Sequence, residues 1–254
     1  MARFNFGDAQ IYFEVTGQGP PLLYLPGVTD FITNHADLRA RLAQNYRVIA
    51  ADLPGSGRST PQPRVYHRDY YGEDAQAFFA LLDREAPGES AHLVGFSDGA
   101  EVALFMATLD PGRARSVLVW GGSGFVDDPG GAAVAAFHGV VDDPLPEMRP
   151  YRDFLVAAYG TDLARAITQG FAQGLAAIVA AGGNICRAEA HRITCPVCLF
   201  AGQTDPFVTK SLIDDLAALI PLAEAHMVAD AGHAIHSDHP DWFADRVSGW
   251  LARH

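Results

Sequence analysis

The sequence of 254 residues has few cysteines and no long uncharged apolar run. Its three cysteines, Cys186, Cys195 and Cys198, provide no disulfide framework. The first residues contain no apolar run of signal-peptide length, and no stretch reaches the length of a membrane span. We therefore expect a cytoplasmic protein that does not insert into a membrane.

Positive charge is also scarce. The chain has 18 Lys and Arg against 30 Asp and Glu, which gives a formal net charge of −12 at pH 7. Nucleic acids and anionic membrane surfaces attract proteins through clustered positive charge, so neither is an expected partner. The length suits one α/β domain that carries an inserted segment.

The two closest cysteines do not predict a metal or redox site. Cys195 and Cys198 lie in a near-continuous apolar run at 193–201, which is typical of a buried parallel strand. Residues three apart in a strand face opposite sides of the sheet, so the two sulfurs should diverge. Because no second cysteine pair exists to complete a zinc site, we expect buried cysteines and no metal.

The strongest motif surrounds Ser97. An apolar strand at 92–94 leads into Gly-Phe-Ser-Asp-Gly at 95–99, and a helical pattern follows at 100–106. A Gly-x-Ser-x-Gly between strand and helix is a nucleophile elbow, in which the serine occupies a strained turn that points its hydroxyl out of the sheet. The pentapeptide alone is also compatible with an ordinary strand-to-helix turn.

Strand and helix patterns alternate along most of the chain. Repeated strand-helix units predict an α/β fold whose mostly parallel, eight-stranded sheet is flanked by helices. Between 122 and 192 the alternation stops and alanine-rich helical spacing takes over. We interpret 1–121 and 193–254 as the core and 122–192 as an inserted helical cap.

A serine nucleophile needs a base and an orienting acid, because a hydroxyl alone is a poor nucleophile. With such an elbow, the acid and then the histidine follow the serine along the chain. Asp205 and His233 each come directly after a strand, and sites on these sheets gather at strand carboxyl ends. We predict Ser97 as the nucleophile, His233 as general base and acid, and Asp205 as the residue that holds the imidazole.

Other residues compete for these roles. Asp127 also follows a strand and is an alternative to Asp205 as the acid. His236 and His239 lie close to His233 in the sequence, and we assign them to the turn and the start of the last helix. His92 lies inside the strand before the elbow, where a core residue is expected.

Acyl transfer also needs donors for the developing oxyanion. The backbone N–H of Asp98, directly after the nucleophile, is one candidate. The N–H of Val28, in the loop after the strand at 21–25, is the second.

Several motifs resemble those of the α/β-hydrolase superfamily. They are the elbow at 95–99, Asp-Leu-Pro-Gly-Ser-Gly-Arg-Ser at 52–59, Gly-Gln-Thr-Asp at 202–205 and Gly-His at 232–233. The Ser-Asp-Gly of the elbow, Leu-Pro-Gly at 25–27 and Gly-Asn-Ile-Cys-Arg at 183–187 are similar to the biphenyl-hydrolase-like (valacyclovirase) group. The sequence departs from many members at Phe96 and Ala100, where those have Trp and Gly.

The resemblance implies an α/β-hydrolase fold and cleavage of small-molecule carboxylic esters through an acyl-enzyme, with no cofactor. It makes α-amino-acid esters the leading substrate class. Three alternatives stay open: a carbon–carbon bond hydrolase and a cofactor-free haloperoxidase with the same triad, and a non-catalytic binding protein on this fold. Haloalkane dehalogenases and epoxide hydrolases are disfavoured, because both use Asp as the nucleophile. The sequence does not predict the oligomeric state.

Two further hypotheses concern the substrate. The Asp98 carboxylate is expected either to accept a hydrogen bond from a substrate ammonium or simply to favour the helix N-terminus through the helix dipole. Bulky cap residues are expected to line an apolar leaving-group pocket, or else to pack the cap against the sheet. They are Phe137, Met148, Tyr151, Phe154, Tyr159 and Phe171.

Overall fold

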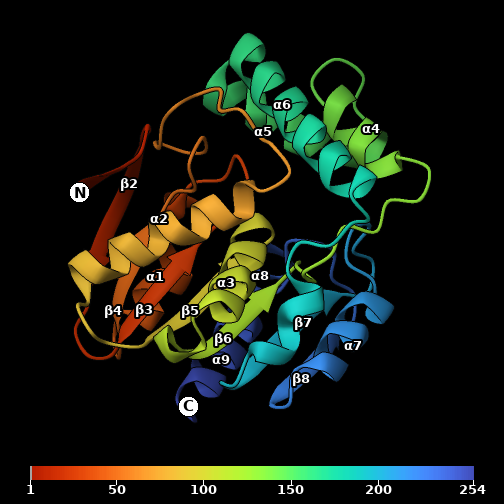
Figure 1. Cartoon of the computed structure of the whole chain (residues 1–254). Helices are drawn as coiled ribbons and strands as arrows, with labels where there is room; N and C mark the ends of the chain where they lie inside the picture. The colour runs from red at the N-terminus through yellow and green to blue at the C-terminus, as the bar shows by residue number, and fades with distance from the viewer. Residues whose placement is uncertain (1) are drawn as a thin grey trace.

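Eight strands form one sheet in the computed structural model, which describes residues 2–254 (Figure 1). Their order in the sheet is β1-β2-β4-β3-β5-β6-β7-β8. The pairs β1–β2 and β2–β4 are antiparallel, and all other pairs are parallel, which confirms the predicted mostly parallel, eight-stranded sheet. The strands are β1 (Ala2–Phe6), β2 (Ala9–Thr16), β3 (Pro21–Leu25), β4 (Arg47–Ala51), β5 (Ala91–Phe96), β6 (Ala114–Trp120), β7 (Val197–Gly202) and β8 (Ala223–Val228).

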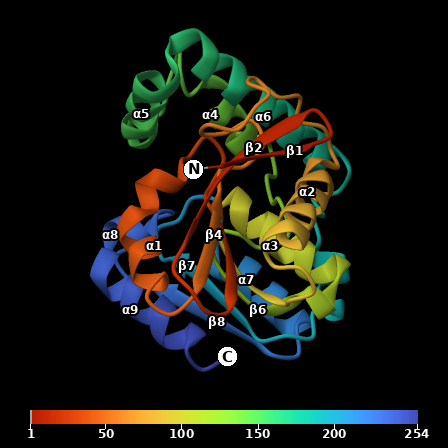
Figure 2. The same cartoon turned by 90° about the vertical axis from the view of Figure 1, so that its left-hand side faces the viewer.

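Helices cover both faces of this sheet. Figure 2 shows α1, α8 and α9 on one side of the strands and α2 and α3 on the other. The core helices are α1 (Ala36–Leu42), α2 (Tyr70–Glu85), α3 (Asp98–Leu109), α7 (Lys210–Leu219), α8 (Ile235–Asp238) and α9 (Pro240–Leu251). Short 3-10 turns lie at Ile32–His35, Pro111–Arg113, Pro146–Met148 and Arg187–Arg192.

The central strands are buried on both faces. Every residue of β3 and β5 is buried, which explains why the sequences of these strands are almost entirely apolar. Alternate side chains enter opposite layers: Leu23 packs in the apolar layer with α2 and α3, whereas Leu22 packs in the layer with α1 and α9. Two apolar layers therefore hold the sheet rigidly beneath the loops at its carboxyl end.

Three helices between β6 and β7 lie together beyond the carboxyl ends of the strands (Figure 1). They are α4 (Ala132–Gly139), α5 (Arg149–Tyr159) and α6 (Thr161–Ala180). Val140, Leu155 and Ala164 form part of a separate small apolar cluster among these helices. We retain the division into a core of 1–121 and 193–254 and a cap of 122–192 as a proposal. No helix within residues 2–254 is both long enough and apolar enough to cross a membrane.

Candidate active site

Ser97 occupies a strained turn between β5 and α3. Its φ of 53° and ψ of −120° are unusual for a residue with a side chain. The glycines on either side make this turn possible: a Cβ on Gly95 would lie 2.3 Å from the Gly99 carbonyl oxygen, and one on Gly99 would lie 2.4 Å from the Leu25 carbonyl oxygen. Strand and helix thus approach too closely for any larger residue.

The side chains of Ser97, His233 and Asp205 form a continuous chain of hydrogen bonds. Ser97 Oγ lies 3.0 Å from His233 Nε2, and His233 Nδ1 lies 2.8 Å from Asp205 Oδ2. The other carboxylate oxygen, Asp205 Oδ1, accepts hydrogen bonds from the backbone N–H groups of Phe207 and Val208 at 2.8 and 3.2 Å. A carboxylate fixed in this way directs Nδ1–H toward itself and leaves Nε2 free to accept the serine proton.

The His233 ring is held from several sides. A Cβ on Gly121, which has a φ of +68°, would lie only 2.8 Å from His233 Cε1. The Phe207 ring packs edge-on against the imidazole, with centroids 5.3 Å apart, and the Phe96 ring lies 5.1 Å away. The backbone at Gly121 and these two rings therefore restrict the imidazole to the position that reaches Ser97.

The competing residues make other contacts. Asp127 lines the cavity beside Ser97, but among residues 2–254 it forms no hydrogen bond with His233. His236 Nδ1 accepts a 3.0 Å hydrogen bond from the Trp120 indole, and burial lowers the pKa of His236 to about 3. Neutral His236 therefore accepts a structural hydrogen bond from Trp120 beside the candidate active site.

Two other histidines lie away from Ser97. His92 Nδ1 lies 2.8 Å from Ser116 Oγ, and burial lowers the His92 pKa to about 4, as expected of a core residue. His239 immediately precedes α9, consistent with its assignment to the start of the last helix.

The predicted oxyanion donors are both free to donate. The backbone N–H groups of Val28 and Asp98 have no hydrogen-bond acceptor anywhere in 2–254. The loop after β3 reaches the nucleophile, because a Cβ on Gly27 would lie 3.2 Å from Ser97 Cβ. Asp98 directly follows Ser97, and Val28 directly follows Gly27, so one unpaired donor adjoins the nucleophile and the other adjoins the loop residue that approaches it.

A cavity of about 290 Å³ opens beside Ser97 and His233. Its apolar lining comes mainly from the segment between β6 and β7 and includes Ala132, Phe137, Met148, Phe171 and Leu175. Apart from His233 and Tyr71, its ionisable lining is acidic over the described residues: Asp98, Glu101, Asp127, Asp128 and Glu147 contribute, and no Lys or Arg does. The cavity therefore has a largely apolar wall and a negative electrostatic potential.

Asp98 is a buried carboxylate with one oxygen occupied. Its Oδ1 accepts hydrogen bonds from the Tyr70 and Tyr71 hydroxyls at 2.9 and 2.8 Å, whereas Oδ2 forms none within the part of the chain described. Burial raises the Asp98 pKa, and the two tyrosine hydrogen bonds oppose that rise. Sequence reasoning missed both tyrosines, because they lie in the first turn of α2 and belong to no recognisable motif.

Glu101, one turn further along α3, is a second buried carboxylate at the cavity. It accepts 2.8 Å hydrogen bonds from the backbone N–H groups of Ser123 and Gly124. Burial raises its pKa to about 8. Glu101 therefore orders the loop after β6, which contains Gly121.

Of the six cap residues predicted to line the pocket, three do so, namely Phe137, Met148 and Phe171. Tyr151 Oη lies 2.8 Å from Thr29 Oγ1, and the Tyr159 hydroxyl donates a 2.6 Å hydrogen bond to the Thr29 carbonyl. The Phe154 ring packs edge-on against Phe31, with centroids 6.3 Å apart. Helix α5 thus directs these three side chains to the loop after β3, where they join the cap to the core, and we do not retain them as pocket residues.

The match to a known family agrees with the fold. The Alpha/beta hydrolase family matches residues 22–246 of the chain. The protein belongs to the alpha/beta-hydrolase family. It is therefore a hydrolase, and the fold predicted from its motifs is confirmed.

The relatives of this alpha/beta hydrolase include two kinds of enzyme. The human serine hydrolase BPHL is 27% identical over 257 residues, which cover 98% of this chain and 86% of the relative. The 2-hydroxymuconate semialdehyde hydrolase of Pseudomonas sp. (strain CF600) is 29% identical, covering 93% of this chain and 88% of the relative. The resemblance to the biphenyl-hydrolase-like group is thus confirmed.

A solved structure shares the fold. The 2-hydroxy-6-oxo-6-phenylhexa-2,4-dienoate hydrolase from Rhodococcus sp. strain RHA1 superposes with a TM-score of 0.80 at 21% identity. The superposition covers 98% of this chain and 97% of that one. At this identity the likeness concerns the fold alone.

Proposed function

We propose that this hydrolase cleaves carboxylic esters through an acyl-enzyme and that it prefers α-amino-acid esters. The observation that carries the proposal is the chain of hydrogen bonds from Ser97 through His233 to Asp205, at 3.0 and 2.8 Å, beside a cavity with acidic walls. Nucleophile, base and orienting acid are within reach of one another, as nucleophilic catalysis requires.

In the first half of the reaction, Ser97 Oγ attacks the ester carbonyl carbon while His233 Nε2 takes the hydroxyl proton. The carbonyl oxygen becomes an oxyanion and accepts hydrogen bonds from the N–H groups of Val28 and Asp98. Each such donor typically contributes roughly 10²- to 10³-fold in rate. The C–O bond then breaks, and His233 gives its proton to the departing alcohol, which leaves the acyl group on Ser97.

In the second half, His233 takes a proton from water, and the resulting hydroxide attacks the acyl carbon. The tetrahedral intermediate is stabilised by the same two donors. Its collapse returns the proton from His233 to Ser97 Oγ and releases the carboxylic acid. Asp205 stabilises the imidazolium in both halves and is not itself protonated.

The acidic lining favours a neutral or cationic substrate. No Lys or Arg of the described chain lines the cavity, and four acidic side chains do so besides Glu101, whose pKa of about 8 leaves it largely protonated near pH 7. Asp98 Oδ2 makes no hydrogen bond with residues 2–254, so a substrate ammonium can bind it. A hydrogen bond between charged groups contributes about 1.5–3 kcal/mol. This supports the hypothesis that Asp98 recognises the α-amino group, beyond any effect on the helix dipole.

A carbon–carbon bond hydrolase is the second candidate, because a relative with that type of activity is 29% identical. The name 2-hydroxymuconate semialdehyde denotes a carboxylate substrate. An anionic substrate would be repelled by the acidic lining of this cavity, and no side-chain cation of 2–254 lines it to compensate. The ester hydrolase is therefore the better supported proposal.

The nucleophile is tested by covalent labelling. A fluorophosphonate should label the wild-type protein stoichiometrically at Ser97, and Ser97→Ala should abolish both labelling and ester hydrolysis. Ser123→Ala removes a second serine that lines the same cavity and should leave labelling intact. Stoichiometric labelling that persists in Ser97→Ala would contradict the proposal.

The substrate class is tested with matched pairs of esters. We expect kcat/KM for an α-amino-acid ester to exceed that for its N-acetyl counterpart, and Asp98→Asn to remove the difference while simple esters are still cleaved. Asp127→Asn neutralises another acidic residue of the lining and should preserve the preference. Efficient turnover of a ring-fission dienoate with no ester cleavage would establish the second candidate instead.

A further inference from the structure

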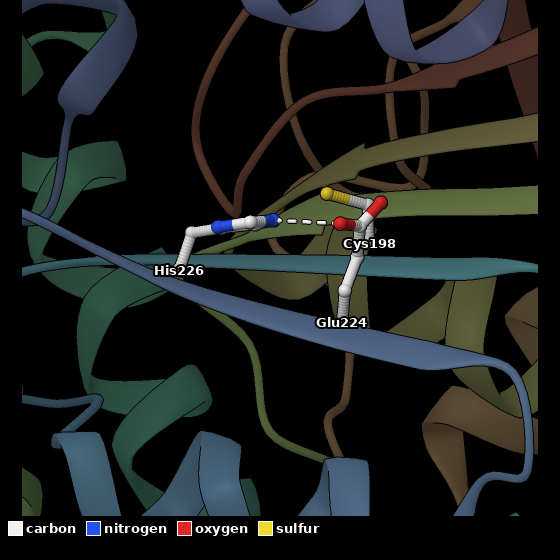
Figure 3. Close-up of side chains that lie close together, drawn as sticks. All are labelled: Cys198, Glu224 and His226. Carbon is white, nitrogen blue, oxygen red and sulfur yellow. Dashed lines mark hydrogen bonds and ion pairs between the residues drawn. The ribbon is translucent and has the colours of Figure 1, made fainter. Parts of the chain in front are cut away.

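Three side chains of different chemistry converge on β7 and β8, away from the cavity beside Ser97. They are Cys198, Glu224 and His226, and their potential ligand atoms all lie within 4.8 Å of one another (Figure 3). None of them lines the cavity beside Ser97. We propose that these three residues bind a divalent transition-metal ion of the zinc type.

The paired strands fix the positions of the three residues. Cys198 on β7 is paired directly with Glu224 on β8, and Phe200 is paired with His226 two residues further on. Side chains two residues apart on one strand lie on the same face of a sheet. The pairing of the two strands therefore places one cysteine, one glutamate and one histidine next to one another on the same face of the sheet.

Neighbouring side chains orient the two outer donors. The Trp250 indole N–H donates to Glu224 Oε1, which leaves Oε2 facing His226 Nε2 at 3.1 Å. The His226 ring stacks on Phe200, with centroids 5.1 Å apart and planes inclined by 28°. Such supporting contacts around metal ligands commonly fix ligand orientation and tune affinity. Both outer donors are thus held in place by residues of the protein core.

The donor set fits zinc better than a hard cation. Cysteine sulfur, histidine nitrogen and carboxylate oxygen are the ligands that Zn²⁺ takes in proteins, whereas Ca²⁺ and Mg²⁺ prefer oxygen alone. A second cavity of about 470 Å³ is lined by all three residues and leaves room for water as a fourth ligand. An ion can reach the buried sulfur from this side, because the Glu224 and His226 side chains are 44–45% exposed.

Two local features oppose binding, and each can be overcome. Burial raises the pKa of the Cys198 thiol, so the ion must displace a proton from sulfur when it binds. Arg253 Nη2 lies 4.0 Å from Glu224 Oε1, but its side chain is 61% exposed and can move into solvent. A bound cation would then take the place of the guanidinium beside the carboxylate.

Metal binding here would cross-link the two strands that lead to Asp205 and His233. An ion that binds the folded but not the unfolded chain stabilises the fold by RT ln(1 + L/Kd), where L is the concentration of free ion. We therefore expect Zn²⁺ to raise the midpoint of thermal unfolding and to take no part in bond cleavage. The inference is independent of the proposed ester hydrolysis.

Cobalt titration of the full-length, metal-free protein tests the site. Co²⁺ replaces Zn²⁺ in such sites, and a cysteine ligand gives a thiolate-to-cobalt charge-transfer absorption in the near ultraviolet. We expect this absorption to saturate at one equivalent, to disappear when Zn²⁺ is added, and to be lost in Cys198→Ser. Cys195→Ser, which removes a nearby buried cysteine outside the cluster, should retain it.

A second variant keeps the test decisive if Cys198→Ser fails to fold. His226→Gln changes an exposed side chain and should weaken Co²⁺ affinity by at least about tenfold, because the loss of even an outer-shell partner of a metal ligand typically costs about that much. His191→Gln, which removes an exposed histidine elsewhere, should leave the affinity unchanged. Absence of a charge-transfer absorption in the wild type, its survival in Cys198→Ser, or unchanged affinity in His226→Gln would overturn the proposal.

Discussion

The Tyr71 hydroxyl donates a 2.8 Å hydrogen bond to Asp98 Oδ1, and Tyr70 donates a second to the same oxygen at 2.9 Å. Because these donors hold one oxygen of the carboxylate, the other is left to face a ligand. They also favour the ionised form of Asp98 in a place where burial raises its pKa. The tyrosines therefore position the proposed ammonium-binding group and oppose the rise in its pKa that burial causes.

Tyr71→Phe tests this relationship. Loss of a hydrogen bond to a charged group costs about 1.5–3 kcal/mol, and about 1.4 kcal/mol corresponds to tenfold in an equilibrium constant. We expect the preference for an α-amino-acid ester over its N-acetyl counterpart to fall by about tenfold. The measurement is the ratio of kcat/KM values for the two substrates in both proteins.

Tyr66→Phe is the matched control. The Tyr66 ring packs edge-on against Tyr70, with centroids 5.1 Å apart, but its buried hydroxyl has no hydrogen-bond partner in residues 2–254. Its removal should leave the substrate preference unchanged. Equal losses for both substrates in Tyr71→Phe would show that Tyr71 supports the elbow and has no bearing on the ammonium.

Gly121→Ala should misplace the imidazole. The added methyl group would lie 2.8 Å from His233 Cε1, and the φ of +68° at Gly121 is unfavourable for alanine. A displacement of about 1 Å in a catalytic group can cost roughly 10²-fold, so we expect a loss of at least that size in kcat. Steady-state kinetics and the rate of fluorophosphonate labelling measure the effect.

Gly249→Ala provides the comparison, because a Cβ there meets no atom within 4 Å. Gly249 lies inside α9, where alanine is favoured over glycine by roughly 0.5–1 kcal/mol, so this variant should keep full activity and gain slightly in stability. Full activity in Gly121→Ala would mean that the imidazole is less tightly confined than the contacts indicate.

The arrangement around Ser97 could be predicted because it depends on local signals and on topology. Glycines at 95 and 99 mark a turn too tight for side chains, and the structure shows that a Cβ at either position would meet backbone atoms. Asp205 and His233 each follow a parallel strand, and the carboxyl ends of parallel strands meet at one edge of the sheet. Residues far apart in the sequence were therefore expected near Ser97.

The direction of individual side chains could not be predicted in the same way. Phe137 and Phe154 are both aromatic residues of the cap, yet only Phe137 lines the cavity. The difference arises from how α4 and α5 are rotated against the core, and short helical patterns do not specify that rotation. Likewise, Cys198 meets Glu224 through the register of β7 and β8, which a search for a second cysteine in the sequence does not reveal.

His236 should make the fold sensitive to acid. Burial lowers its pKa from 6.5 to about 3, and its Nδ1 must stay unprotonated to accept the Trp120 hydrogen bond. A histidine with a depressed pKa in the folded state stabilises the fold above pH 6.5, and this contribution is lost as the pH falls from 6.5 toward 3. At pH 5 the loss relative to pH 7.5 is about 2 kcal/mol.

Urea unfolding at pH 7.5 and pH 5 measures this loss. His236→Gln keeps an acceptor for the Trp120 indole but cannot be protonated, so its free energy of unfolding should fall less between the two pH values than that of the wild type. His191→Gln, at an exposed site, controls for removal of a histidine. Equal pH dependence in His236→Gln and the wild type would assign the acid sensitivity to other groups.

Phe137 and Phe154 allow a matched test of the leaving-group pocket. Phe137 lines the cavity, where it stacks on Phe207 with centroids 5.3 Å apart, whereas Phe154 packs outside the cavity against Phe31. Burial of apolar area contributes roughly 25 cal/mol per Å², so a bulky alcohol group in contact with Phe137 gains more than a methyl group does. We expect Phe137→Ala to lower kcat/KM by about tenfold more for a benzyl ester than for the methyl ester of the same acid.

Phe154→Ala should change both esters by the same factor, because any effect it has acts through the attachment of the cap. If Phe137→Ala also changes both esters equally, the alcohol group does not bind against this wall, and the acyl group occupies the apolar part of the cavity.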